Sequence, residues 1–166
     1  MELSASYGMR TAAIDEDNYS KSESQTGSFA WYFIEMSALE FSYTRGRGTQ
    51  SLKASGDLGP TIYYVDLEAI GADLIVTLAA KTSLFQPYVS GGVAKIKKKI
   101  YKEDYTGAIS NFGQPIDDVV PSYGAGIKIN LTQAFNLKFS YNRRKSGSSS
   151  DTTWDDEIRS GASWYF

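Results

Sequence analysis

Apolar and polar residues alternate with a period of two through nearly the whole chain, and no long helical periodicity is present. In the first segment Leu3, Ala5 and Tyr7 share one face, and Ser4 and Ser6 share the other. Successive side chains of a β-strand point to opposite faces, so this alternation indicates strands. The pattern predicts eight strands, within residues 2–10, 28–33, 39–44, 63–78, 84–101, 122–131, 137–142 and 154–166.

The polar segments between these strands alternate in length. The long ones are residues 11–25, 46–60, 102–120 and 146–153, and the short ones are 35–38, 79–83 and 132–134. This order is typical of an up-and-down antiparallel transmembrane β-barrel with four long outer loops and three short periplasmic turns. An even number of strands places both termini on the periplasmic side. In the fourth strand the apolar positions change parity near Ile70–Gly71, which we interpret as a one-residue β-bulge.

Alternation alone also fits a soluble, lipocalin-type barrel with an apolar interior. The polar face of the predicted strands carries charges of both signs, which survive burial only when they are paired. The apolar face has aliphatic residues in strand middles and aromatic residues towards strand ends, which resembles a lipid-facing band between aromatic girdles. We therefore favour the membrane barrel and expect a lumenal charge network of Glu2, Arg10, Glu40, Asp66, Glu68, Asp73, Lys128, Lys138, Glu157 and Arg159.

Composition excludes several classes of site. The chain has no cysteine and no histidine, so it cannot form a disulfide or a thiolate or imidazole metal site. Its formal net charge of −2 gives no support for nucleic-acid binding. No apolar run is long enough for a transmembrane helix. We expect one barrel domain over residues 1–166, and we infer that Met1 replaces a removed export signal.

The chain ends in Gly161-Ala162-Ser163-Trp164-Tyr165-Phe166, which resembles the C-terminal signal of outer-membrane barrels. Residues 86–93 (QPYVSGGV) and 121–127 (PSYGAGI) are similar to strands of the same family. The whole chain thus resembles the small OmpA-type and OmpX-like barrels. This resemblance implies a bacterial outer-membrane location and a terminal strand, with Gly161, Trp164 and Phe166, that the barrel-assembly machinery reads. No peptidoglycan-binding segment follows the predicted barrel, so cell-wall anchoring is not expected.

Some barrels of this size are enzymes: lipid A deacylases, lipid A palmitoyltransferases and omptin proteases resemble this chain in size or architecture. All of them use a histidine, which this chain lacks, because such chemistry needs a base of near-neutral pKa. A carboxylate site of Asp66, Glu68 and Asp73 on one face is the remaining option. We favour a structural charge network over that site and expect no enzymatic activity and no cofactor.

Basic residues gather at the outer ends of the fifth and seventh predicted strands: Lys95, Lys97, Lys98, Lys99, Arg143, Arg144 and Lys145. They are suited either to lipopolysaccharide phosphates or to a solvated strand extension, and the sequence does not separate the two. The acidic clusters Asp15–Asp17, Asp117–Asp118 and Asp155–Glu157 fit solvated loop charge better than a Ca²⁺ or Mg²⁺ site, and we expect no metal site.

The longest predicted loop carries Tyr101, Tyr105, Ile109 and Phe112, which fit either a partner contact or packing of the loop on itself. We expect a monomeric, non-enzymatic barrel with an envelope-structural or surface-interaction role. Its expected partners are outer-membrane lipid, lipopolysaccharide and surface ligands of the outer loops, since binding functions concentrate on loops. The alternative is a narrow channel for small polar or apolar solutes.

Overall fold

The computed structural model describes the chain except residues 14–18, 53–60, 81, 104–106 and 147–152, and it leaves out the side chains of some neighbouring strand residues. The described residues form the strands β1 (Glu2–Ala13), β2 (Tyr19–Ile34), β3 (Ser37–Leu52), β4 (Thr61–Thr77), β5 (Phe85–Glu103), β6 (Ile109–Asn111), β7 (Ile116–Asn130), β8 (Phe135–Ser146) and β9 (Thr153–Tyr165). No helix in this described part is long and apolar enough to cross a membrane.

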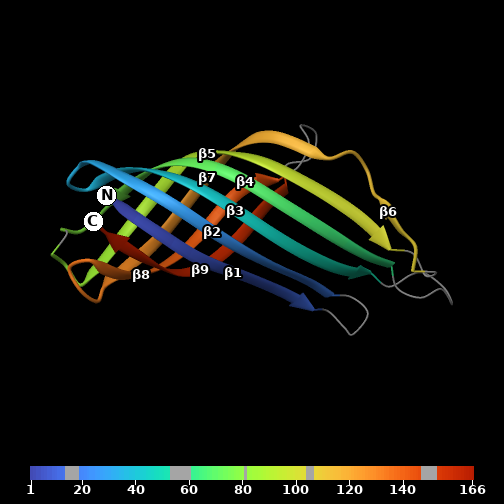
Figure 1. Cartoon of the computed structure of the whole chain (residues 1–166), viewed down its shortest axis with the longest axis horizontal. Helices are drawn as coiled ribbons and strands as arrows, with labels where there is room; N and C mark the ends of the chain where they lie inside the picture. Colours follow the sequence, from blue (N-terminus) through green and yellow to red (C-terminus); the bar gives the residue numbers. More distant parts are fainter. Residues whose placement is uncertain (14–18, 53–60, 81, 104–106, 147–152) are drawn as a thin grey trace.

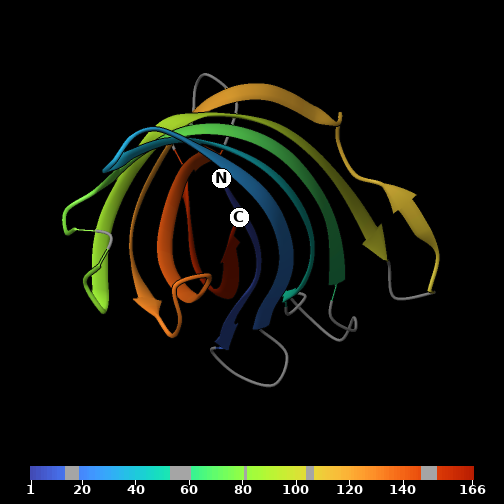
Figure 2. The ribbon, with the colours of Figure 1, turned by 60° about the vertical axis from the view of Figure 1, so that its left-hand side comes forward.

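The strands form one antiparallel sheet that closes on itself (Figures 1 and 2). Neighbouring strands follow the order β4-β3-β2-β1-β9-β8-β7-β5, and pairing of β4 with β5 completes the ring. The short strand β6 pairs with the end of β5 and lies outside this ring. The eight-stranded antiparallel barrel predicted from the alternation is confirmed.

Both termini lie at one end of the barrel, which we call the terminal end (Figure 1). The terminal ammonium of Met1 donates a hydrogen bond to the carbonyl of Phe166 over 2.9 Å. The short connections at residues 35–36, 78–84 and 131–134 also lie there. In the last of these the hydroxyl of Thr132 accepts hydrogen bonds from the backbone N–H groups of Ala134 and Phe135, which fixes a tight turn. We call the opposite end the far end.

Towards the far end the strands run well beyond the predicted ones. Strand β1 continues to Ala13 and pairs there with Tyr19, inside the expected loop 11–25. Strand β5 continues to Glu103, and β7 already begins at Ile116. These extensions mix charged and apolar residues without one consistently apolar face, which resembles a loop in the sequence, but their backbone groups still satisfy one another across the sheet.

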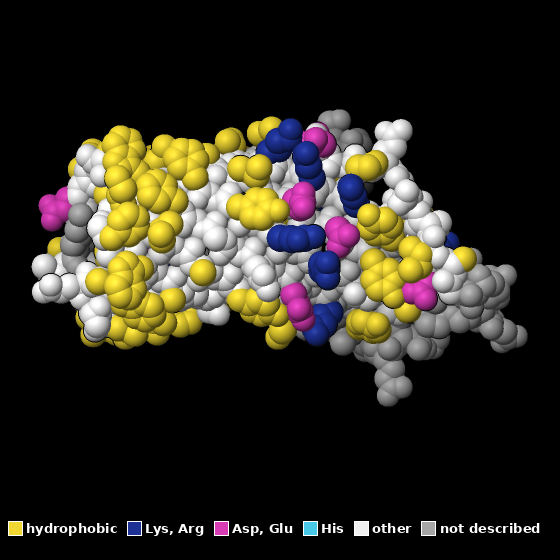
Figure 3. Space-filling view, viewed as in Figure 1, with side chains coloured by type: hydrophobic (Ala, Val, Ile, Leu, Met, Phe, Trp, Pro, Cys, Tyr) yellow, Lys and Arg dark blue, Asp and Glu magenta, His cyan; other side chains and the backbone are white. Residues whose placement is uncertain are grey.

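An apolar band covers the outer surface in the half of the barrel nearer the terminal end (Figure 3). On β5 the band runs from Phe85, 54% exposed, to Val93, 51% exposed. This segment rises about 26 Å at roughly 3.3 Å per residue. A strand tilt of roughly 35–45° shortens that to about 20 Å along the barrel axis, close to the roughly 25 Å apolar band of transmembrane barrels.

The predicted bulge near Ile70–Gly71 is wrong. The register of β4 with β3 runs without a shift from Val76 to Thr61, and its register with β5 is equally continuous. The parity of the apolar residues changes because the surroundings change with height along β4, not because the strand slips. A register shift does occur in β2, between Tyr32 and Ile34 next to the turn into β3.

Candidate functional site

Buried ion pairs fill the barrel interior, beginning at the terminal end with Glu2 and Lys128. Their charged atoms are 2.7 Å apart, and the two side chains are 1% and 0% exposed. The hydroxyl of Tyr32 donates a hydrogen bond to Glu2, and Lys128 donates one to that same hydroxyl. The Lys128 ammonium also lies 5.4–5.8 Å from the ring centres of Tyr32, Tyr88 and Tyr165, at cation–π distance. The pair thereby gains the extra contacts that burial of a charge requires.

A second layer lies further along the interior. Lys138 forms an ion pair with Glu40 over 2.6 Å, and its ammonium lies 5.4 Å from the ring centre of Tyr88. Asp73, on the neighbouring strand, accepts a hydrogen bond from Ser122. These contacts join β3, β4, β5, β7 and β8 across the lumen.

A third layer involves Arg159 and Glu157 of β9. Arg159 donates hydrogen bonds to Glu157 and to Thr44, and Ser24 of β2 donates to Glu157. Thr44 is also hydrogen-bonded to Thr26 over 2.8 Å. In an eight-stranded barrel of this kind side chains can occupy the whole interior, and these three layers cross it from wall to wall.

Seven residues of the expected lumenal network therefore face the interior: Glu2, Glu40, Asp73, Lys128, Lys138, Glu157 and Arg159. The backbone of Arg10 pairs with Ser22, and its side chain lies outside the described part. The placement of Asp66 and Glu68 in the lumen is wrong, because the unbroken register of β4 turns both outward and exposes them. The carboxylate site of Asp66, Glu68 and Asp73 is excluded for the same reason, since Asp73 alone of the three faces inward.

Asp66 and Glu68 belong to a belt of charges that we call the charged belt. Figure 3 shows it as a stripe across the long axis, next to the apolar band. Its exposed cations in the described part are Lys21, Arg45, Arg47, Lys95, Lys97, Lys99 and Arg143. Its exposed carboxylates there are Glu23, Asp66, Glu68, Asp117 and Asp156.

Opposite charges face one another across strand boundaries in the charged belt. Glu23 lies opposite Arg47, Arg45 lies opposite Glu68, and Glu68 lies opposite Lys97. Cross-strand pairs of this kind stabilise a sheet by a few tenths of a kcal/mol up to roughly 1 kcal/mol. The register thus explains why the belt holds carboxylates as well as cations.

The ion pairs of the charged belt have longer N–O distances than the ion pairs in the barrel interior. Asp66 lies 3.8 Å from Arg47, Lys95 lies 3.3 Å from Asp117, and Arg143 lies 3.3 Å from Asp156. Lys21 lies 3.0 Å from Glu23, and this hydrogen bond holds the pKa of Glu23 below its ordinary value. All these side chains are about half exposed or more, so solvent screens them.

The basic residues singled out in the sequence do not all share one surface. Lys95, Lys97, Lys99 and Arg143 belong to the belt. Lys98 and Arg144 lie at the alternate positions of their strands, which face the interior, and they line a cavity inside the barrel. The side chain of Lys145 lies outside the described residues. Four belt residues were not expected from the sequence: Lys21, Glu23, Arg45 and Arg47. Asp117 and Asp156 were expected only as solvated charge of acidic clusters. The four unexpected residues alternate with serine, glycine or threonine, which was the available signal, but Lys21, Glu23 and Arg47 fell in segments that were interpreted as loops.

The remaining candidates are placed as follows. Gly161 lies where an added Cβ would collide with the backbone of Ala5, and Trp164 and Phe166 are exposed at the terminal end. The acidic cluster Asp15–Asp17 lies outside the described residues. Among those that are described, no three acidic side chains converge to hold a metal ion.

Part of the expected apolar loop packs against the barrel. The ring of Phe112 lies 5.2 Å from that of Tyr63 on β4, in an edge-to-face arrangement. Its backbone N–H donates to Ile100 of β5 over 2.8 Å. Tyr101 is half-buried and Ile109 is exposed, whereas Tyr105 lies outside the described residues. Packing of this segment on its own strands therefore accounts for Phe112.

Comparison with known proteins agrees with this architecture. The family model of the outer membrane protein beta-barrel domain matches residues 2–166. A search of curated protein sequences finds no match. Among solved structures, the N-terminal beta-barrel domain of Pseudomonas aeruginosa OprF is similar with a TM-score of 0.62 at 17% identity, over 98% of this chain and 96% of that one.

Two further structures resemble the barrel. Neisserial surface protein A (NspA) is similar with a TM-score of 0.63 at 16% identity, over 99% of this chain and 96% of that one. Ail of Yersinia pestis, solved in complex with the heparin analogue sucrose octasulfate, has a TM-score of 0.54 at 16% identity, over 98% of this chain and 97% of that one. At these identities the structures support the fold, and the family match covers almost every residue. The chain is therefore an integral outer-membrane protein and belongs to the outer membrane protein beta-barrel domain family.

Proposed function

We propose that this protein is a non-enzymatic barrel with an envelope-structural and surface-interaction role, and that its charged belt binds lipopolysaccharide phosphates. In this proposal the terminal end faces the periplasm and the far end faces outward. The observation that carries it is the position of the charged belt, directly beyond the lipid-facing apolar band. Phosphate groups of outer-leaflet lipid lie at that height, because they border the hydrocarbon layer.

The composition of the belt supports this role. Its described cations outnumber its described carboxylates, and Lys95, Lys97 and Lys99 repeat every second residue on one strand. Lysine and arginine bind phosphate as charged donors. Ail was solved with a polysulfated ligand, which is consistent with anion binding by a barrel of this fold.

An assay with matched variants tests the proposal. The triple variant Lys95→Gln/Lys97→Gln/Lys99→Gln removes outward charge from β5, and Lys98→Gln removes an inward charge from the same strand. Each lysine near an anionic surface contributes about 1 kcal/mol. We expect the triple variant to bind immobilised lipopolysaccharide about a hundredfold more weakly, and Lys98→Gln to bind like the parent protein.

Lipopolysaccharide stripped of its phosphates provides the second control. The difference between the parent protein and the triple variant should disappear with this ligand. Equal binding of the parent protein and the triple variant to the phosphorylated form would contradict the proposal.

The absence of enzymatic activity is part of the same proposal. The chain has no histidine, and the interior carboxylates Glu2, Glu40 and Glu157 each form an ion pair with a buried cation. A carboxylate held in such a pair is a poor general base, because proton uptake would break the pair.

The alternative function, a narrow channel, is opposed by the three layers of side chains across the lumen. Planar-bilayer recording of the refolded protein tests it. We expect no defined openings. Reproducible openings that change when Lys138→Ala removes the middle ion pair would establish the channel instead.

We also propose that the barrel is a monomer, since closure of the sheet leaves no unpaired edge along the lipid-facing band. The exposed aromatic residues of the terminal strand, Trp164 and Phe166, are available to the assembly machinery during insertion. The far end, where the strands extend past the belt, is the surface that we propose for further partners.

A further inference from the structure

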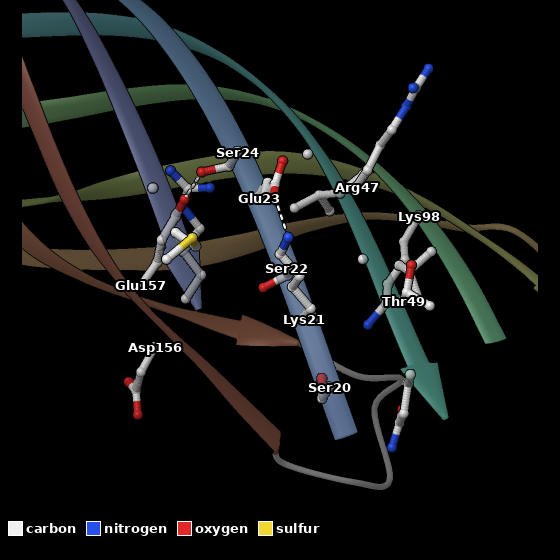
Figure 4. A pocket seen from close by; sticks show the side chains of 18 of the residues that line it. Ser20, Lys21, Ser22, Glu23, Ser24, Arg47, Thr49, Lys98, Asp156 and Glu157 are labelled. Carbon is white, nitrogen blue, oxygen red and sulfur yellow. Dashed lines mark hydrogen bonds and ion pairs between the residues drawn. The ribbon is translucent and has the colours of Figure 1, made fainter. Parts of the chain in front are cut away.

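A cavity of about 260 Å³ lies inside the far half of the barrel (Figure 4). Its volume corresponds to roughly nine water molecules at ~30 Å³ each. The third interior layer, where Ser24 donates to Glu157, borders it on the side towards the terminal end. The cavity therefore has room for a small ligand and is separated from the terminal end by the layers of ion pairs.

One wall of the cavity is apolar, although the barrel interior is otherwise mostly polar. Val65 and Leu67 of β4 and Ile96 of β5 form this wall. Leu67 packs against a small buried cluster that includes Ile96 and Ala69. When an apolar group covers apolar surface that borders an open cavity, the free energy falls because that surface is removed from water.

Next to this apolar wall, the inward positions of the neighbouring strands are mostly small, since Gly46 pairs with Leu67 and Gly48 pairs with Val65. Strand β3 contributes Gly46 and Gly48, and β2 contributes Ser20 and Ser22. A Cβ added at Gly48 would meet no atom closer than 3.6 Å. These small residues hold the space open and supply hydroxyl groups along one side of it.

A cationic side chain borders the same cavity. Lys98 stands at an inward-facing position of β5, where it pairs with Leu67 of β4, and its side chain is half-buried. None of the ion pairs between described residues involves Lys98. Figure 4 places Lys98 across the cavity from Asp156 and Glu157. An ammonium next to an apolar wall matches a ligand with one anionic group and one short apolar chain.

Backbone pairing between β1 and β9 ends beside the cavity. Pairing of β1 with β9 ends at Gly8 and Arg159, whereas β1 stays paired with β2 as far as Ala13. Strand β9 likewise stays paired with β8 beyond this point. Gly8 and Glu157, one from each of these two strands, line the cavity at the point where the pairing ends.

We propose that this cavity binds a small amphipathic anion, with the anionic group at Lys98 and the apolar chain against Val65, Leu67 and Ile96. The ligand class is a short-chain alkyl carboxylate or alkyl phosphate. It reaches the cavity either as a free solute or as part of a lipid that enters between β1 and β9. Octanoate is a suitable probe, because it combines one carboxylate with one short alkyl chain.

The test uses the full chain in nanodiscs of phosphatidylcholine, with methyl-labelled isoleucine, leucine and valine. Titration with octanoate should shift the methyl resonances of Val65, Leu67 and Ile96 in a saturable way. Outward Val93 and Ile70 report partition into the lipid and should not saturate with them. Octanol, which lacks the charge, should bind about tenfold more weakly, a difference of about 1.4 kcal/mol.

Three variants locate the site. Lys98→Gln should weaken octanoate binding about tenfold, and the neighbouring outward variant Lys97→Gln should leave it unchanged. Gly48→Leu should fill the cavity and abolish binding, while a heat-dependent gel shift confirms that the barrel is folded. Equal affinity of Lys98→Gln and the parent protein for the probe that binds would overturn the proposal, as would the absence of saturable shifts at the three methyl groups with both octanoate and the lipid probe dioctanoyl phosphatidic acid.

A parallel titration distinguishes the two sources of the ligand, a free solute and a membrane lipid. Dioctanoyl phosphatidic acid incorporated in the nanodisc presents the same chemistry from the membrane. Saturable shifts with octanoate alone indicate a free solute, and saturable shifts with the lipid alone indicate entry from the bilayer. Both outcomes support the site, and failure of both probes would overturn it.

Discussion

The interior and the charged belt use the same residue types in opposite ways. Inside, Glu2 and Lys128 are 2.7 Å apart and essentially inaccessible to solvent. On the belt, Arg47 and Asp66 are 3.8 Å apart and both more than half exposed. Removing one partner of a buried pair costs about 3–5 kcal/mol, whereas an exposed pair contributes roughly 0–1 kcal/mol. The same chemistry therefore makes the fold sensitive to loss of one partner in the interior, whereas on the belt it leaves charges available for surface binding.

Lys128→Ala should give the largest loss of stability. It leaves Glu2 charged and without its cation in the buried interior, so we expect the free energy of unfolding to fall by about 3–5 kcal/mol. Urea-induced unfolding in lipid vesicles measures this change. The double variant Glu2→Gln/Lys128→Met removes both charges and should recover much of the loss. A double variant as unstable as the single one would show that the tyrosine contacts, not the ion pair, stabilise this layer.

Adding one methyl group distinguishes the filled part of the interior from the hollow part. At Gly92 an added Cβ would collide with the backbone of Ala72 on β4, and at Gly48 it would enter the far-end cavity. Overpacking costs about 1–3 kcal/mol, so Gly92→Ala should lower stability by that amount. Gly48→Ala should change it by no more than about 0.5 kcal/mol. Equal losses in the two variants, measured by the same unfolding assay, would contradict this division.

Arg47→Gln should have the smallest effect. It breaks an exposed belt pair, and we expect a loss of at most about 1 kcal/mol that disappears in molar salt, because salt screens exposed charges. The matched interior variant, Lys138→Gln, should keep its larger loss at high salt. A loss for Arg47→Gln that persists in molar salt would mean that the belt stabilises the barrel as the interior does.

Much of the barrel could be predicted from local pattern. Alternation in segments such as residues 122–131 and 137–142 predicts strands wherever one face meets lipid, since the contrast between the faces is then largest. The same contrast identified Glu40, Lys138 and Arg159 as interior residues. Beyond the apolar band the outer face carries charges, so the contrast between the two faces is weak, and residues 11–25 and 102–120 resemble loops although most of them are paired.

Strand β4 shows where local pattern fails. Asp66 and Glu68 share a parity with Ile70 and Leu74, and an argument from polarity alone must place them on opposite faces. Only pairing with β3 and β5 shows that the face is continuous. Between Ile70 and Asp66 the outer surface of β4 changes from lipid-facing to charged. The inner surface of the same strand changes from charged at Asp73 to apolar at Val65 and Leu67.

Local sequence pattern and composition were enough to predict the strand period, the alternating connections and the lack of histidine and cysteine chemistry. Those properties depend on residues close together in the chain. Which charges form pairs, where the interior stays open and which lysines of β5 point outward could be read only from the folded barrel. Each of these depends on the height of a residue along the barrel, and that height is fixed by hydrogen bonds between strands distant in sequence.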